Sequence, residues 1–225
     1  MPNIDNLNDD QLDVIQETGN IGCSHAATAV SQMIGKIVDI SVPNLQVKKL
    51  SELNTAINQI FDKNEKVVGV YLELVDEFKG SILFLFPLKS ALALSDVLVG
   101  QDPGTATDLD EMAESAITEV GNIVVSAYTN ALGNLLQETV MLSTPTFAYD
   151  MPDGVLEKVY DTLGEKATHA LIFDIKFSGE DDLFTSYFVL LPSLESLENL
   201  IQKLIPEISA ETDQQVREYA ESLAK

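Results

Sequence analysis

Two sets of polar residues recur along the chain with the same internal spacing. They are Asp13, Glu17 and Asn20 in the first set and Ser115, Glu119 and Asn122 in the second. On a helix, positions i, i+4 and i+7 lie within about 60° of one another, so each set lines one face. Each face then carries a carboxylate next to a neutral amide, which both donates and accepts hydrogen bonds. A single stripe of this kind is usually a solvated helix face, but its recurrence favours a functional interpretation.

The recurrence extends to residues around the polar sets. A glycine precedes each asparagine (Gly19 and Gly121), and a proline follows each one by 23 positions (Pro43 and Pro145). Every pair is separated by 102 residues, which indicates an internal repeat. The glycines can serve the close approach of another backbone or packing between helices. We expect the prolines to shape edge strands beside the two helices.

Cys23 and His25 are a second candidate for chemistry, as a nucleophile and its base. Neither recurs in the second copy, and no acidic residue stands at a spacing that would orient the histidine. With one cysteine and two histidines, the sequence offers no disulfide and no metal-ligand spacing. We therefore expect no metal site, and cysteine usage fits a reducing, cytoplasmic location.

The formal net charge of −23, from 36 acidic and 13 basic residues, restricts the possible partners. Nucleic acid and anionic membranes require a positive surface, so they are excluded as expected partners and proteins are favoured. The apolar runs are of strand length and end at prolines, and the N-terminus lacks the basic and apolar regions of a signal peptide. We expect a globular protein that neither spans a membrane nor is secreted.

Hydrophobic periodicity predicts the elements that position the two polar sets. In the first half these are a helix capped by Asp9 or Asp10 and ending at Gly35, an edge strand over 37–47, a helix over 51–62 capped by Ser51, a hairpin of 66–75 and 80–86, and a helix over 88–98. In the second half they are a helix over 109–136, a strand over 138–149, a helix over 153–163, a hairpin of 167–177 and 183–191, and a helix after Pro192. The offset between the halves grows from 102 to 105, which places a three-residue insertion around 178–182.

These elements predict an α/β (α+β) fold of two similar units. A three-stranded unit is marginal alone, so we expect one mostly antiparallel six-stranded sheet, with two long helices packed on it and pseudo-two-fold symmetry. Residues 1–205 would form a single domain of two repeats, about 8–100 and 109–204, joined by the linker-like stretch 101–108. Residues 206–225 would form an acidic, helical C-terminal tail.

The segments from Glu17 and from Glu119 closely resemble the two signature helices of the CheC, CheX and FliY phosphatases. The shared pattern is Asp or Ser, three residues, Glu, two residues, Asn, twenty-two residues and Pro, and both copies satisfy it. Two centres in one chain are similar to CheC, whereas CheX resembles a single-centre chain that dimerises. FliY carries an additional flagellar-switch domain, for which 225 residues leave no room.

The resemblance implies hydrolysis of the aspartyl phosphate on a chemotaxis response regulator of the CheY type. An acyl phosphate reacts through a loose transition state, so a catalyst mainly has to place one water in line with the leaving oxygen. Asn20 and Asn122 would position this water. Glu17 and Glu119 would each pair with the active-site lysine of the regulator.

The resemblance also implies the remaining parts of the system. Asp13 and Ser115 would support docking, and magnesium would belong to the regulator, so no cofactor is expected on this chain. CheD, a receptor-modifying deamidase, is a possible second partner. The alternative is a non-catalytic adaptor that binds phospho-CheY, CheD or both. A structural component of the flagellar motor would require a motor-binding segment that the sequence does not show. His25 stands where the family has small residues, so the two centres need not be equal.

Overall fold

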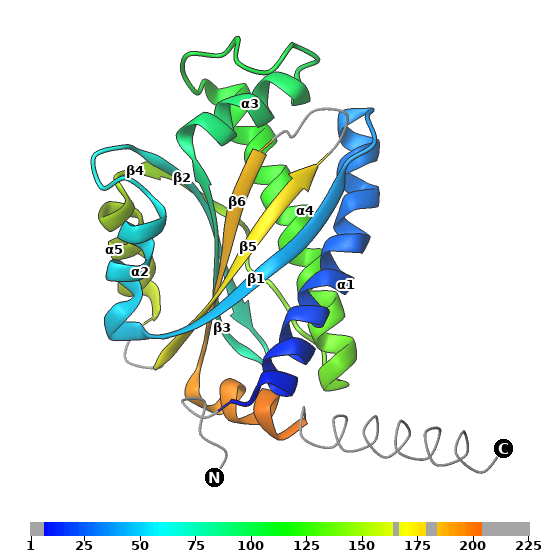
Figure 1. Cartoon of the computed structure of the whole chain (residues 1–225), viewed down its shortest axis with the longest axis vertical. Coiled ribbons are helices and arrows are strands. Elements are labelled where there is room, and N and C mark those ends of the chain that lie inside the picture. Colours follow the sequence, from blue (N-terminus) through cyan, green and yellow to red (C-terminus); the bar gives the residue numbers. More distant parts are fainter. Residues whose placement is uncertain (1–6, 164–166, 179–183, 204–225) are drawn as a thin grey trace, which may run out of the picture.

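The computed structural model describes residues 7–163, 167–178 and 184–203, which form two successive sets of similar elements (Figure 1). The first half contains α1 (Asp9–Ile34), β1 (Asp39–Lys49), η2 (Leu50–Glu52), α2 (Leu53–Ile60), β2 (Val67–Val75), β3 (Lys79–Pro87) and α3 (Leu88–Leu98). The second half contains α4 (Glu111–Leu136), β4 (Thr146–Asp150), α5 (Pro152–Leu163), β5 (His169–Ser178) and β6 (Phe184–Pro192), and residues 194–203 are helical. The predicted tail over 206–225 lies outside the described residues.

All six strands form one sheet in the order β1-β5-β6-β3-β2-β4, and every neighbouring pair is antiparallel. When the two halves are exchanged, this order reads the same from the opposite edge. The first strand of each half pairs with the middle strand of the other half, β1 with β5 and β4 with β2. The predicted six-stranded sheet with pseudo-two-fold symmetry is therefore confirmed, and β3 and β6 begin and end 105 residues apart as expected.

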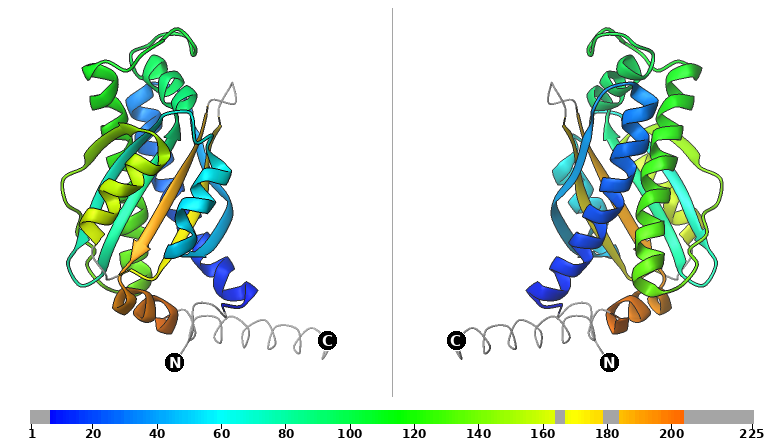
Figure 2. Two further views of the ribbon diagram at one scale, coloured as in Figure 1. Left: turned by 90° about the vertical axis from the view of Figure 1, so that its left-hand side faces the viewer. Right: turned by 90° about the vertical axis from the view of Figure 1, so that its right-hand side faces the viewer.

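Helices cover both faces of the sheet (Figure 2). The long helices α1 and α4 lie side by side on one face, and the shorter α2 and α5 lie on the other. Between α4 and the sheet, Tyr128 of α4 forms an aromatic cluster with Phe173 of β5 and Phe188 of β6, with ring centroids 4.6 to 5.6 Å apart. Burying one such ring stabilises the fold by about 1.5–3 kcal/mol, so this cluster holds α4 firmly on the sheet.

Helix α1 begins at a different cap from the one predicted. Asn8, in an extended conformation, accepts a hydrogen bond from the backbone N–H of Gln11, whose side chain in turn accepts one from the backbone N–H of Asn8. The prediction of Asp9 or Asp10 as cap is wrong, because both lie inside the first turn, where their charges favour the helix dipole. The helix ends at Gly35, whose φ of 72° suits glycine.

The glycine-containing stretch of α1 continues without a break, and its second glycine touches the other long helix. An added Cβ on Gly22 would lie 2.6 Å from Cα of Tyr128. Gly22 therefore allows α1 and α4 to approach backbone to backbone. This contact fixes the relative position of the two helices that carry the polar sets.

Two predicted elements differ in the structure. Ser51 does not cap α2, because Leu50–Glu52 form a 3₁₀ turn and α2 starts at Leu53 without a side-chain cap. The strand predicted over 138–149 is regular only in β4, which starts directly after Pro145. Leu142 still forms an isolated β-bridge to β2. The sheet edge at β4 is therefore interrupted, whereas β1 at the opposite edge is one continuous strand.

The linker-like stretch between the halves is held by a buried carboxylate. Asp96, in α3 and 1% exposed, accepts hydrogen bonds from the backbone N–H groups of Gly104, Thr105 and Ala106 and from the Thr105 hydroxyl. Burial raises the pKa of Asp96, but these hydrogen bonds outweigh it and hold the pKa below its ordinary value. The connection between the repeats is therefore a fixed loop.

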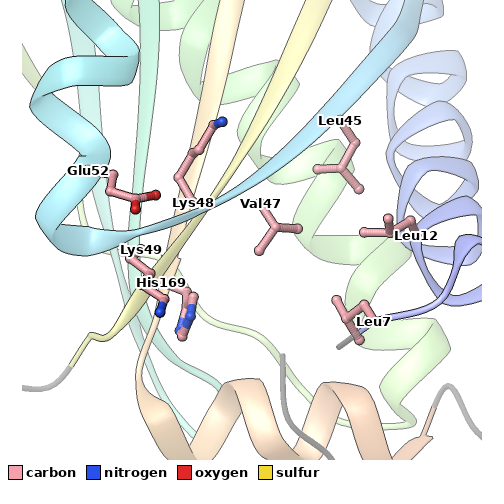
Figure 3. Close-up of a pocket in the computed structure, with 8 residues that line it drawn as sticks. All are labelled: Leu7, Leu12, Leu45, Val47, Lys48, Lys49, Glu52 and His169. Carbon is pink, nitrogen blue, oxygen red and sulfur yellow. The ribbon is translucent and has the colours of Figure 1, made fainter. Parts of the chain in front are cut away.

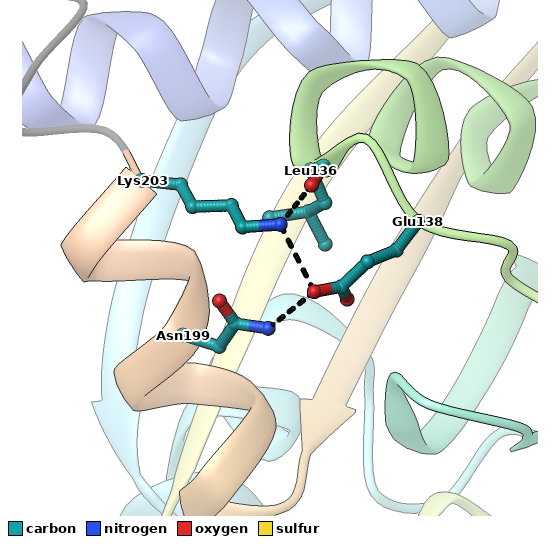
Figure 4. A network of polar contacts seen from close by, with 4 residues as sticks. All are labelled: Leu136, Glu138, Asn199 and Lys203. Carbon is teal, nitrogen blue, oxygen red and sulfur yellow. Dashed lines mark hydrogen bonds and ion pairs between the residues drawn. The ribbon is translucent and has the colours of Figure 1, made fainter.

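Residues 194–203 are anchored to the end of α4 by a polar network (Figure 4). Lys203 donates to the carbonyl of Leu136 and to Glu138 Oε1 at 2.9 Å, and Asn199 donates to the same oxygen at 2.8 Å. Hydrogen bonds from Asn199 and Lys203 lower the pKa of Glu138. A lysine at the C-terminal end of a helix also interacts favourably with the helix dipole.

Candidate functional site

The first polar set lies on the solvent-exposed face of α1, as its spacing predicts. Asp13 and Glu17 are exposed, and Asn20 is half-buried. The helix turns its opposite face, with Ile15, to the core. The amide of Asn20 is thus accessible, with one side against the protein and the other beside the glutamate.

Hydrogen bonds fix the orientation of the Asn20 amide. Its Oδ1 accepts from the backbone N–H of Val42 in β1 at 3.0 Å, and its Nδ2 lies 3.4 Å from Glu17 Oε2. A backbone N–H can only pair with the oxygen of the amide, so the NH2 group must face Glu17. The first centre therefore presents a hydrogen-bond donor at the surface.

A second residue of α1 holds the same strand residue. Gln16 Nε2 donates to the carbonyl of Val42 at 2.9 Å, so Gln16 and Asn20, four positions apart, bind both polar groups of one backbone residue. Because β1 is an edge strand, these two side chains substitute for a neighbouring strand. We call Gln16, Asn20 and Val42 the amide clamp.

A bulge in β1 accompanies the amide clamp. The register between β1 and β5 shifts between Ser41 and Asn44, so that Val42 and Pro43 together face one residue of β5. Proline lacks a backbone N–H and is tolerated at a bulge or on an edge strand. The predicted edge strand around Pro43 is confirmed, and it lies beside Asn20.

The second polar set is placed like the first but is held differently. Ser115 and Glu119 are exposed on α4, and Asn122 is half-buried. Within the part of the chain that the structure describes, no side-chain or backbone group is hydrogen-bonded to the Asn122 amide. Thr118, the counterpart of Gln16, bonds instead to the Glu114 carbonyl of its own helix at 2.7 Å. The second centre has no amide clamp.

The motif glycines face the sheet. An added Cβ on Gly19 would lie 3.4 Å from Val42 and 3.5 Å from Phe173, which is ordinary contact. On Gly121 it would lie 2.9 Å from three atoms of Val70, which is too close. These glycines seat the helices on the strands.

Cys23 and His25 do not form a catalytic pair. Cys23 is buried and His25 is exposed, so they belong to different faces of α1. Burial raises the pKa of the Cys23 thiol to about 12, which suppresses its nucleophilic thiolate at neutral pH. Among the described residues, no group of three or more His, Cys, Asp or Glu side chains could hold a metal ion.

Sequence reasoning missed Gln16 and Val42. The signal lay in the comparison of the two copies, because glutamine stands four residues before one asparagine and threonine before the other. The partner strand residue could not be found from sequence, since its contact depends on how α1 lies across β1.

A cavity of about 300 Å³ opens near the start of α1, away from both asparagines (Figure 3). Its lining joins an apolar floor to charged side chains: Leu7, Leu12, Leu45, Val47, Lys48, Lys49, Glu52 and His169. None of the helices in the described ranges is long and apolar enough to span a bilayer.

Comparison with known proteins gives matches for both halves. The model of the CheC-like family matches residues 11–46 and 112–149, which cover each polar set and the segment that follows it. The chain is 28% identical over 203 residues to the CheY-P phosphatase CheC of Bacillus subtilis, covering 88% of this chain and 95% of that protein.

Two further matches extend over most of the chain. It is 26% identical to the flagellar motor switch phosphatase FliY of Bacillus subtilis, covering 96% of this chain and 55% of FliY. Its fold is similar to the crystal structure of Thermotoga maritima FliY, with a TM-score of 0.72 and 22% identity over 89% of this chain and 98% of that one. The CheC-like family model thus matches the motif segment in both halves of the chain, and the fold is similar to that of FliY.

Proposed function

We propose that this protein is a phosphatase that hydrolyses the aspartyl phosphate of a CheY-type response regulator. One observation carries the proposal: on each long helix, a half-exposed asparagine lies one turn from an exposed glutamate, as the duplicated motif requires. The relative named as a CheY-P phosphatase spans nearly the same length and supports this substrate class.

Each residue type suits a role in this reaction. Asn20 and Asn122 position a water in line with the acyl phosphate, because a neutral amide can bind water without repelling the phosphoryl group. Glu17 and Glu119 pair with a lysine of the regulator and thereby fix the docking register. Ser115 supports docking one turn earlier on α4, as Asp13 does on α1.

The proposal also covers the cofactor, the location and the partners of the protein. Magnesium belongs to the regulator, and this chain contributes no cofactor. The protein acts in the cytoplasm, and CheD is a second candidate partner. The charge of −23 agrees with a protein partner that supplies the cation for each glutamate.

The decisive experiment follows the decay of radiolabelled phospho-CheY with and without this protein. The wild-type chain is expected to shorten the phosphate lifetime, and the double variant Asn20→Ala/Asn122→Ala to lose about 10²–10³-fold of that acceleration. Asn134→Ala, at an exposed asparagine later on α4, is the matched control and should remain active.

The result can go against the proposal in two ways. If the double variant accelerates decay as well as the wild type, the amides do not position the water. If the wild-type chain binds phospho-CheY without shortening its lifetime, the protein is an adaptor of the same fold and not an enzyme.

A further inference from the structure

The two centres share a motif but differ in how the asparagine is held. In the first, the Asn20 oxygen is engaged by Val42, and Gln16 binds the carbonyl of the same residue. In the second, Thr118 takes the place of Gln16, and the corresponding strand segment is not regular before Thr146. The sheet edge therefore supports an amide clamp at one centre alone.

The clamp changes what the asparagine can offer to a bound water. A water that attacks phosphorus is best held by an amide oxygen that accepts one of its hydrogens. At the first centre this oxygen points to β1, and the donor NH2 points to Glu17. Rotating the Asn20 amide to present its oxygen breaks the bond to Val42 and leaves a half-buried N–H unpaired. Asn122 can rotate without this penalty.

The polar faces of the two helices also differ in charge, and this difference too favours the second centre. One turn before the motif, the first copy has Asp10 where the second has Met112. Both side chains are exposed, and Met112 is 66% exposed. Glu114, which replaces Leu12 in the second copy, lies on a different face of its helix. An aspartyl phosphate carries about two negative charges. Each additional carboxylate near it weakens docking by about two- to fivefold before salt screening.

We infer that the two centres divide the work: the Glu119–Asn122 centre on α4 carries most of the turnover, and the amide clamp keeps the Asn20 centre slow. Gln16 is a positioning residue, because it acts on Asn20 through Val42. This inference rests on the proposed function and adds which site a phosphorylated acidic partner uses.

Single variants test the division of work in the phospho-CheY assay. Asn122→Ala should lower the rate at least about tenfold, and Asn20→Ala by less than about threefold. In the Asn122→Ala background, Gln16→Thr loosens the clamp and should raise the residual kcat about fivefold. Asp10→Ser, outside the motif, should lower KM about twofold and leave kcat unchanged.

A control variant and a measurement without substrate distinguish a failure of this inference from a failure of the proposed function. Asp161→Ser removes an exposed carboxylate from α5, on the opposite face of the sheet, and should change neither constant. Side-chain amide relaxation by NMR tests the clamp without substrate: Asn20 should be rigid and Asn122 mobile, and Gln16→Thr should mobilise Asn20.

The possible outcomes are distinct. An inactive wild-type chain refutes the proposed function, whereas an active one that loses equal activity in both single variants refutes only the division of work. Equal mobility of the two amides refutes the clamp regardless of activity. A larger loss in Asn20→Ala than in Asn122→Ala would show that the clamp prepares Asn20 for catalysis.

Discussion

Replacing Gly22 by alanine tests the close packing of the two long helices. The new Cβ would lie 2.6 Å from Cα and 3.1 Å from N of Tyr128, and 3.3 Å from O of Ala127. Carbon atoms in contact prefer about 3.5–4.0 Å, and the groups in the way are backbone atoms of α4 that cannot rotate aside. The helices must therefore move apart by about 1 Å.

The size of the effect follows from two opposing contributions. Overpacking of this kind costs up to about 3 kcal/mol, and replacing a helical glycine by alanine returns about 1 kcal/mol. Gly22→Ala should thus lose about 2 kcal/mol of unfolding free energy. Gly19→Ala is the matched control, because its Cβ meets Val42 and Phe173 at ordinary contact distances. It should gain about 1 kcal/mol.

Thermal unfolding followed by circular dichroism measures the difference. For a chain of this length, about 2–4 °C of melting temperature corresponds to 1 kcal/mol. Gly22→Ala should therefore melt about 4–8 °C below the wild type, and Gly19→Ala about 2–4 °C above it. If Gly22→Ala is as stable as Gly19→Ala, the helices are not in backbone contact at this position.

Three other predictions concern groups that are buried or held by hydrogen bonds. Asp96→Asn should cost about 1–3 kcal/mol at pH 7. Because the pKa of Asp96 is lowered in the folded state, its contribution is present above the ordinary carboxyl pKa and is lost as the pH falls through the folded value, so urea midpoints of variant and wild type should converge in acid. Lys203→Met should cost about 1–2 kcal/mol and speed hydrogen exchange over 194–203, while unchanged exchange would contradict the anchoring role of its bond to Glu138. Cys23 should react with iodoacetamide at pH 8 only after unfolding in urea, since burial raises its pKa to about 12; rapid labelling of the native protein would show that the thiol is exposed.

The sequence predicted the type of nearly every described element and the symmetry of the sheet. Helix α3 was predicted with the bounds that the structure has, because Pro87 and the apolar period mark its start. The edge position of β1 was predictable from Pro43, because proline has no backbone N–H and cannot complete the hydrogen bonds to neighbouring strands on both sides. The repeat then predicted the elements of the second half from those of the first.

The remaining features depend on contacts that no local pattern encodes. Residue type alone does not distinguish Asn8, the observed cap, from the two aspartates that follow it, because asparagine and aspartate are equally suitable caps. The exchange of β1 and β4 between the halves is a matter of strand order, which composition and period leave open. The positions of the motif residues on exposed helix faces were predictable from spacing, whereas the bond from Val42 to Asn20 was not. The roles of Glu17, Asn20, Glu119 and Asn122 stay predictions.

The pairing of β1 with β5 and of β4 with β2 affects how the chain must assemble. If the backbone were severed in the loop after α3, each fragment would hold three strands, and each of these strands would lack one of its neighbours. Neither fragment could complete its backbone hydrogen bonds in isolation, so folding of the severed protein would be a bimolecular reaction, with a rate that rises with the concentration of both pieces. In the intact chain the loop held by Asp96 links the two halves, so this encounter becomes an intramolecular search.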